Sequence, residues 1–466
     1  MIFSSIPFLY YFLPIVLILY LITPKKLKNS VLLISSLVFY GWGEPKYVFL
    51  MIATVLVGYI FGILIDKTRG SILSKIFLVL SVLSGVAGLL YFKYADFFIA
   101  NFNAVTGLSV PLLRLSLPIG ISFYTFQILS YSVDVYRGNV KVQKNPVTLA
   151  AYVALFPQLI AGPIVRYSDV ESQLAKRTHS FEKISQGIYR FIIGLSKKVL
   201  IANTLGELCE AFLISGDLSV MYYWLYVICF MLLIYFDFSG YSDMAIGLGK
   251  LFGFDFMENF NYPFISGSIT EFWRRWHISL GTWFRDYIYI PLGGNRVGKI
   301  RHLFNIFTVW FLTGFWHGAE WNFILWGVYF GVLLTLEKFL YLKKLEKHTL
   351  LSHIYVFFFV SVSFMIFASG NLTQTVDFVG GLFGRGSIPL VSKEALYNMR
   401  NYGVVIIIGI LGATPFPKTL YAKIKDKMTG SVIFDIVEIL GCILLLFVVT
   451  SYLADGSFNP FLYFRF

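Results

Sequence analysis

His317 is an ionisable residue within an apolar part of the chain. It lies within the apolar run Phe311-Leu312-Thr313-Gly314-Phe315-Trp316-His317-Gly318-Ala319. An imidazole in such surroundings is costly to bury unless it is hydrogen-bonded, and an ionisable residue at membrane depth is usually functional. We therefore interpret His317 as a residue that performs chemistry. The alternative is that His317 is a core histidine hydrogen-bonded to a backbone carbonyl. Glu320, three residues later, either orients the imidazole or is a charge on a helix surface.

A second histidine, His277, lies in the densest polar stretch of the chain, residues 271–296. On a single helix one face would carry Trp273, Trp276, His277, Leu280 and Gly281, with Arg274 and Arg275 to the side. The pattern is typical of a membrane-surface anchor rich in Trp and Arg. Alternatively, the basic side attracts a phosphorylated, anionic cofactor while His277 faces a reaction chamber. The following Gly293-Gly294-Asn295 indicates a turn and is only a weak signal for a phosphate loop.

The element that carries His317 is expected to be a helix from about residue 302 to about residue 326. One face of it would carry Trp310, Thr313, Gly314, His317 and Trp321. The small residues on this face predict open space beside the imidazole.

Composition places these elements in a membrane protein. Of the 466 residues, 57% are hydrophobic and only 14% are charged, and the mean hydropathy is +0.73, which is not a soluble composition. Long apolar stretches occupy residues 7–22, 47–65, 76–90, 222–235, 323–336, 354–367, 404–412 and 432–453, and several approach the roughly 20 residues that a bilayer requires. The sequence therefore predicts an all-α, polytopic integral membrane protein.

Charge predicts its orientation. Residues 7–22 lack a preceding basic segment, so we expect a retained first span and a mature chain that starts at Met1. Lysine and arginine are enriched in alternate loops of the first part of the chain, which predicts an N-terminus outside the membrane. The net charge of +13 is then mostly explained by topology, and no nucleic-acid partner is expected.

The middle of the chain differs from both ends. Apolar residues there alternate with Gly, Pro and charges, as in Pro118-Ile119-Gly120, in Phe156-Pro157-Gln158 and in the run Asp237-Phe238-Ser239-Gly240-Tyr241-Ser242-Asp243. Such residues break membrane helices and are tolerated where protein or a water-filled cavity satisfies the freed backbone. We expect one domain over residues 1–466 with a cavity-forming catalytic core at roughly 115–340. A polar loop is expected near 383–401 and a basic loop at 418–427, and the three scattered cysteines suggest neither a disulfide framework nor a metal site.

These stretches together resemble the membrane-bound O-acyltransferase family, in its bacterial branch typified by alginate O-acetylation proteins. The matching segments span nearly the whole chain in order: Met1-Ile2-Phe3-Ser4-Ser5, Phe39-Tyr40-Gly41-Trp42, Pro118-Ile119-Gly120-Ile121-Ser122-Phe123-Tyr124-Thr125-Phe126-Gln127, Ala161-Gly162-Pro163-Ile164, the Asp237–Asp243 run, residues 273–295, residues 314–321 and Asn459-Pro460-Phe461-Leu462-Tyr463-Phe464. The two histidine blocks are the most specific of them.

The resemblance implies a helical bundle with a central funnel and re-entrant or broken helices, in a bacterial cytoplasmic membrane. It implies an enzyme that transfers an acyl group, usually acetyl, from a thioester such as acetyl-CoA or an acyl carrier toward an extracellular polysaccharide, with no bound cofactor. His317 matches the catalytic histidine of the family and His277 its second polar position. Relatives work with an extracytoplasmic SGNH-type, serine-hydrolase-like acetyltransferase, so a similar partner is expected. Glu320 departs from the pattern and leaves the local electrostatics open.

The chemistry agrees with that expectation. Acyl transfer to a hydroxyl requires a base, and imidazole, with a pKa of about 6.5, suits neutral pH; His317 is the candidate. His277 or a tryptophan N–H is a candidate donor to the tetrahedral oxyanion. A cluster of arginines suits the phosphates of coenzyme A, namely Arg274, Arg275, Arg285 and Arg296.

Two alternatives stay open. One is transfer of D-alanine to teichoic acid, whose enzymes usually start differently from Met1-Ile2-Phe3-Ser4-Ser5. The other is a transporter or export channel that moves substrate without consuming an acyl donor. The chain has no convincing internal repeat, which argues weakly against the duplicated halves of many transporters.

Overall fold

Helices form all the regular structure in the part of the chain described by the computed structural model, residues 1–160 and 162–456. The prediction of an all-α protein is therefore confirmed. Two sequence features fall outside the described residues, namely Ala161 and the terminal run Asn459-Pro460-Phe461-Leu462-Tyr463-Phe464. The described chain divides into two compact units, residues 1–191 with 244–257, and residues 192–243 with 258–466. The expected single domain stays a prediction.

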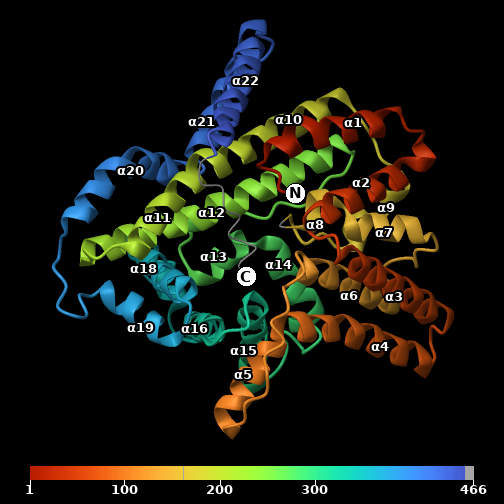
Figure 1. Ribbon diagram of the computed structural model, residues 1–466, viewed down its shortest axis with the longest axis horizontal. Coiled ribbons are helices and arrows are strands. Elements are labelled where there is room, and N and C mark those ends of the chain that lie inside the picture. Colours follow the sequence, from red (N-terminus) through yellow and green to blue (C-terminus); the bar gives the residue numbers. More distant parts are fainter. Residues whose placement is uncertain (161, 457–466) are drawn as a thin grey trace. The chain divides into compact units, whose positions relative to one another are not determined.

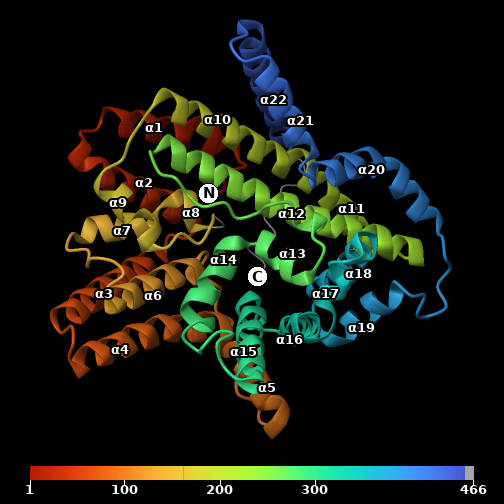
Figure 2. The ribbon, with the colours of Figure 1, turned by 180° about the vertical axis from the view of Figure 1, so that it is seen from behind.

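The first unit contains the N-terminal helices. Its α-helices are α1 (Leu13–Ile22), α2 (Lys28–Gly43), α3 (Val48–Lys67), α4 (Ile72–Leu89), α5 (Ala95–Thr106), α6 (Ile121–Arg137), α7 (Pro146–Ala154), α8 (Phe156–Leu159), α9 (Tyr167–Ala175) and most of α10 (Phe181–Ser196). Short 3₁₀ or π segments are η1 (Phe8–Phe12), η2 (Lys25–Leu27) and η3 (Leu90–Tyr94). Helices α3, α4 and α6 lie side by side in both views (Figures 1 and 2).

The second unit contains both histidine blocks. Its α-helices are α11 (Thr204–Ile214), α12 (Val220–Leu251, of which residues 220–243 belong here), α13 (Ile269–Arg275), α14 (Ile278–Phe284), α15 (Lys299–His317), α16 (Trp321–Leu336), α17 (Leu342–Leu345), α18 (Thr349–Ala368), α19 (Leu372–Gly381), α20 (Lys393–Gly412), α21 (Phe416–Lys427) and α22 (Val432–Ala454). The 3₁₀ or π segments are η4 (Lys197–Asn203), η5 (Pro263–Ile265), η6 (Arg285–Tyr289) and η7 (Glu337–Tyr341).

Seven helical segments among the described residues are long and apolar enough to cross a membrane. They are Val48–Lys67, Ile72–Thr106, Val220–Leu251, Trp321–Leu345, Thr349–Ala368, Lys393–Gly412 and Val432–Ala454. They correspond to seven of the eight apolar stretches in the sequence, and the first stretch forms the shorter helix Phe8–Ile22. Only 6% of the most apolar window of α22 is buried, and this helix projects from its unit in Figures 1 and 2. The protein is thus a multi-pass membrane protein.

Three local predictions were wrong. The polar loop near 383–401 ends early because α20 begins at Lys393, where the Ser392 side chain accepts a hydrogen bond from the Ala395 N–H. The basic segment at 418–427 is helical, in α21. The run from Asp237 to Asp243 does not break its helix, since α12 continues through it.

Gly240 lies in that run at a place where α12 packs closely against neighbouring backbone. A Cβ atom on Gly240 would lie 2.7 Å from the carbonyl oxygen of Gly194 and 3.2 Å from the backbone nitrogen of Lys198. The glycine therefore serves close packing between α12 and the chain around Gly194 and Lys198, in place of the expected break. The breaks expected at Pro118-Ile119-Gly120 and around Pro157 are present, since α6 begins only at Ile121 and α8 is a single turn.

Candidate active site

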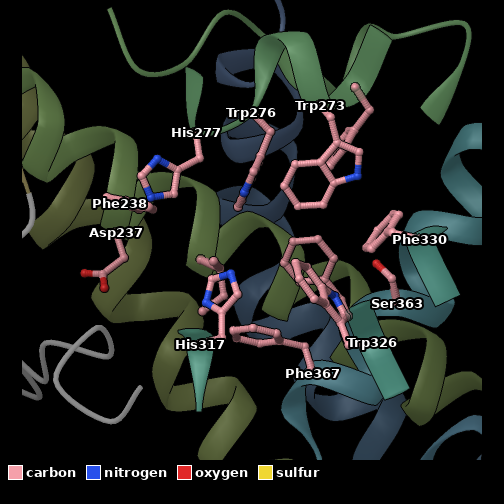
Figure 3. Close-up of a pocket in the computed structure, with 13 residues that line it drawn as sticks. Asp237, Phe238, Trp273, Trp276, His277, His317, Trp326, Phe330, Ser363 and Phe367 are labelled. Atoms are coloured by element: carbon pink, nitrogen blue, oxygen red, sulfur yellow. The ribbon is translucent and has the colours of Figure 1, made fainter. Parts of the chain in front are cut away.

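A cavity in the second unit brings the two predicted histidines together. His277 and His317 both line it, and its volume is about 50 Å³. Besides the two histidines, most of the lining residues are aromatic or aliphatic. They are Ile234, Asp237, Phe238, Phe272, Trp273, Trp276, Trp326, Phe330, Ser363, Phe364 and Phe367. In Figure 3, His277, Trp276 and Trp273 descend from one side of the cavity, and His317, Trp326 and Phe367 rise from the other.

His277 lies at a break between two short helices, so the single helix predicted through this segment was wrong. Helix α13 ends at Arg275, and His277 has φ +47° and ψ +53°, a left-handed conformation, before α14 begins. That conformation costs a non-glycine residue about 1–2 kcal/mol. A neighbouring stretch of backbone stabilises it, since the Ile278 N–H donates to Asn259 O at 2.9 Å and the Asn261 N–H donates to Arg275 O at 2.9 Å.

The His277 ring is almost fully enclosed, with 2% of the residue exposed. Its Nδ1 lies 3.2 Å from Asn259 Oδ1, and its ring is perpendicular to the Phe238 ring, with the centroids 4.6 Å apart. Burial lowers the pKa of His277 to about 3. The imidazole is therefore neutral near pH 7.

Buried acceptors position the helix that leads to His277. The fully buried Glu337 carboxylate of η7 accepts hydrogen bonds from the N–H groups of Ile269 and Thr270 at the start of α13, at 2.5 and 2.9 Å, and from the Thr270 hydroxyl at 2.7 Å. Ser268 caps the same helix by accepting from the Glu271 N–H at 3.0 Å. These acceptors satisfy donors that the first turn of a helix leaves free.

His317 is the last residue of α15, so the expected helix to about residue 326 was wrong. The chain turns through residues 318–320, and α16 begins at Trp321, which is about half exposed and lies on a different helix from His317. The imidazole lies among three aromatic rings, with centroid separations of 4.9 Å to Trp316, 5.0 Å to Trp326 and 5.2 Å to Phe367.

Two glycines fix the position of His317 relative to Trp326. A Cβ atom on Gly314 would lie 2.3 Å from the Phe323 carbonyl oxygen, and one on Gly327 would lie 2.3 Å from the Trp310 carbonyl oxygen. Helices α15 and α16 are therefore in backbone contact at this point. The space predicted beside the His317 imidazole is present, since His317 lines the cavity. Gly314 does not provide it, because α16 packs against this glycine, and the cavity is bounded mainly by large aromatic side chains.

A buried ion pair lies beside the cavity. Asp237 Oδ1 lies 2.6 Å from Lys198 Nζ, and the two side chains are 4% and 1% exposed. The Asp237 carboxylate points away from the aromatic rings in Figure 3. A second pair, Lys197 with Asp243 at 2.7 Å, is more exposed. Charged residues at this depth persist when they are paired.

Trp273 is a hydrogen-bond donor in the cavity wall. Its indole Nε1 is buried and has no hydrogen-bond partner within the described residues, and an indole N–H can only donate. A buried donor without a partner is costly, and in Figure 3 this nitrogen lies on the side of the indole ring that faces away from His277 and His317.

The four predicted arginines are not in the cavity wall as far as the described chain defines it. Arg275 pairs with Glu271 at 2.9 Å and donates to Asn261 O, and Arg285 pairs with the adjacent Asp286 at 2.7 Å. Arg274 and Arg296 are exposed. Their role in binding phosphates stays a prediction.

Sequence reasoning missed other members of the site. Asn259 and Ser279 contact each other and His277, but nothing in their local sequence marks them, because they meet only where the backbone turns. Phe367 and Ser363 come from α18, which reads as an ordinary apolar span. Glu320 is exposed and precedes α16, and burial of part of its side chain raises the pKa of its carboxyl.

Comparisons with known proteins identify the family of the chain. A model of the membrane-bound O-acyltransferase family matches residues 142–369, a range that includes every residue lining the cavity. Along its whole length the chain is 39% identical to the probable alginate O-acetylase AlgI of Pseudomonas putida, all of which is covered. It is 32% identical, again along its whole length, to the peptidoglycan O-acetyltransferase of Helicobacter pylori, of which 98% is covered.

A more distant relative is the teichoic acid D-alanyltransferase of Bacillus subtilis, which is 30% identical over 54% of this chain and 68% of that protein. The full-length similarity to O-acetylating enzymes extends through both histidine blocks. The chain therefore belongs to the membrane-bound O-acyltransferase family and is an O-acyltransferase.

Proposed function

We propose that this enzyme transfers an acetyl group from a cytosolic thioester, acetyl-CoA or an acyl carrier, toward a hydroxyl of an extracellular or cell-wall polysaccharide, with His317 as general base. The observation that carries the proposal is the meeting of His277 and His317 in one aromatic cavity. Full-length similarity to a probable alginate O-acetylase and to a peptidoglycan O-acetyltransferase supports the acetyl group and the class of acceptor.

The proposed step is acyl transfer through a tetrahedral intermediate. His317 takes the proton of the attacking hydroxyl as its oxygen bonds to the thioester carbonyl carbon. The oxyanion that forms accepts a hydrogen bond from a donor in the cavity wall, such as a tryptophan N–H, and one such donor is typically worth about 10²–10³ in rate. The C–S bond then breaks, and the thiolate takes the proton back from the imidazolium. The products are an O-acetyl ester and a free thiol.

D-alanyl transfer is the second candidate, because of the similarity to a teichoic acid D-alanyltransferase over about half of the chain. A D-alanyl group carries an ammonium that would lose its hydration inside the cavity, where the carboxylate of Asp237 is already paired with Lys198. An uncharged acetyl group avoids that cost, so the lining favours acetyl.

The proposed function also concerns the membrane in which the enzyme lies and its orientation there. We propose a bacterial cytoplasmic membrane with the N-terminus outside, which places the basic loops in the cytosol. The acyl donor then binds from the cytosolic side, and the acceptor binds from the opposite side of the membrane. An extracytoplasmic SGNH-type acetyltransferase is the proposed partner that receives or passes on the acetyl group.

The test uses purified full-length protein in proteoliposomes with radiolabelled acetyl-CoA or a D-alanyl carrier protein. We expect thiol release and acetyl transfer with acetyl-CoA, and a loss of about 10²–10⁴-fold in His317→Gln. His348→Gln is the matched control, because His348 is exposed and is not among the cavity-lining residues. Labelling only from the D-alanyl carrier would select the second candidate. Solute flux without thiol release, unchanged in His317→Gln, would overturn the enzymatic role.

A further inference from the structure

The amide of Asn259 has one orientation, which its partners determine. Its Oδ1 accepts from the Ser279 backbone N–H at 3.2 Å and from the Ser279 hydroxyl at 2.9 Å. Its Nδ2 donates to Ser242 Oγ at 3.1 Å. A backbone N–H can only donate, so the atom facing Ser279 is the oxygen.

This orientation decides where His277 carries its proton. Nδ1 of His277 lies 3.2 Å from the same Asn259 oxygen. An amide oxygen can only accept, so Nδ1 carries the hydrogen, and in a neutral imidazole Nε2 then presents a lone pair. Nε2 is buried and has no hydrogen-bond partner in the described part of the chain.

We propose that Asn259 is a positioning residue that fixes His277 as the Nδ1–H tautomer, so that His277 Nε2 accepts a hydrogen bond from a donor group on the substrate. This inference rests on the proposed acyl transfer and revises one role in it. His277 does not donate to the oxyanion, because that would require a second proton, and burial of the ring opposes the imidazolium.

Two substrate groups have the required chemistry. One is a hydroxyl of the acceptor other than the hydroxyl that His317 deprotonates, since each hydroxyl has a single proton. The other is an amide N–H in the pantetheine arm of the acyl donor. The two are separated by comparing hydrolysis of acetyl-CoA, which needs no polysaccharide, with transfer to the acceptor.

The direct test is ¹⁵N NMR of histidine-labelled protein in bilayers. The chain has six histidines, so the His277 signals are assigned by their loss in His277→Gln. We expect a protonated Nδ1 and an unprotonated Nε2 at pH 7, and mixed tautomers in Asn259→Leu. Asn261→Leu is the matched control, because the Asn261 side chain is exposed and its backbone pairing survives the change. A protonated Nε2 or a charged ring at pH 7 would overturn the inference even if the enzyme transfers acetyl groups.

Kinetics provide the functional arm. We expect Asn259→Leu to lower kcat on the order of 10-fold, while Asn259→Asp, whose carboxylate still accepts from Nδ1, recovers much of the rate and moves the pH profile. The other titratable side chains that line the cavity in the described chain are Asp237, paired with Lys198, and His317. A purely structural role for Asn259 predicts that the loss of rate follows the loss of thermal stability in both variants. Equal pH profiles for Asn259→Asp and the unmodified protein would contradict the positioning role.

Discussion

His277 lies where two short helices meet and is fixed through hydrogen bonds, whereas His317 ends a long helix and lies among aromatic rings. Around His277, an amide, a hydroxyl and the backbone of residues 259–261 determine both the ring position and its tautomer. Around His317, the close approach of α15 and α16 at Gly314 and Gly327 places the ring against Trp326. Hydrogen bonds thus determine the protonation of one histidine, and packing determines the position of the other.

The largest effect on stability is expected from breaking the buried ion pair of Lys198 and Asp237. Lys198→Met leaves the Asp237 carboxylate buried without its cation, which should cost about 3–5 kcal/mol of stability. Lys197→Met is the matched control, because its pair with Asp243 is more exposed, and should cost about 1 kcal/mol or less. The thermal midpoint in detergent, followed by tryptophan fluorescence, measures both. Equal losses would mean that burial does not distinguish the two pairs.

The packing that positions His317 should respond to one methyl group. Gly314→Ala places a Cβ atom against the Phe323 carbonyl and should cost about 1–3 kcal/mol while lowering the rate of acetyl transfer. Gly403→Ala in α20 is the control, since a Cβ atom there meets nothing within 4 Å, and alanine favours the helix. Thermal midpoints and initial rates are compared for both. A Gly314→Ala protein with normal stability and rate would show that the helix contact is not needed.

The pH dependence of stability should report on His277. Its folded pKa of about 3 lies below the unfolded value of about 6.5. As the pH falls below 6.5, the unfolded chain binds a proton that the folded protein does not, so stability decreases, by about 1 kcal/mol at pH 5.5. His277→Gln removes this contribution and should flatten the thermal midpoint between pH 7.5 and 5.5. His348→Gln, in which an exposed ring is lost, should not; parallel curves for all three proteins would contradict a buried neutral His277.

The smallest effect is expected from the arginines outside both histidine environments. If Arg274 binds the phosphates of coenzyme A, Arg274→Ala should raise the KM for acetyl-CoA about fivefold, equivalent to roughly 1 kcal/mol for an exposed contact. The KM for acetyl-N-acetylcysteamine, which lacks phosphates, should not change. Arg275→Ala serves as the comparison, because its pairing with Glu271 predicts a loss of stability with either donor. A parallel rise in KM for both thioesters would exclude phosphate binding by Arg274.

The class of fold could be predicted from composition, and the cost of burying an imidazole singled out the two histidines that line one cavity, because both arguments are local. The sequence did not predict where helices end. Trp321 shares the face of His317 on an ideal helix, yet the chain turns at Gly318 and Trp321 starts α16. Asn259 could not be assigned to His277 from the sequence. The His277 ring reaches Asn259 because the backbone of His277 itself, between α13 and α14, is left-handed. Helical periodicity assumes continuous helices, and this site is built at two of their ends.

The order in which the cavity residues leave the ribosome has its own consequence. The lining begins in α12 and is completed by Phe367 near the end of α18. The two histidines are therefore not enclosed together until α18 has been synthesised and inserted. A chain interrupted before that helix would present both imidazoles without their aromatic surroundings, so the nascent protein acquires its reactive chamber only late in biogenesis.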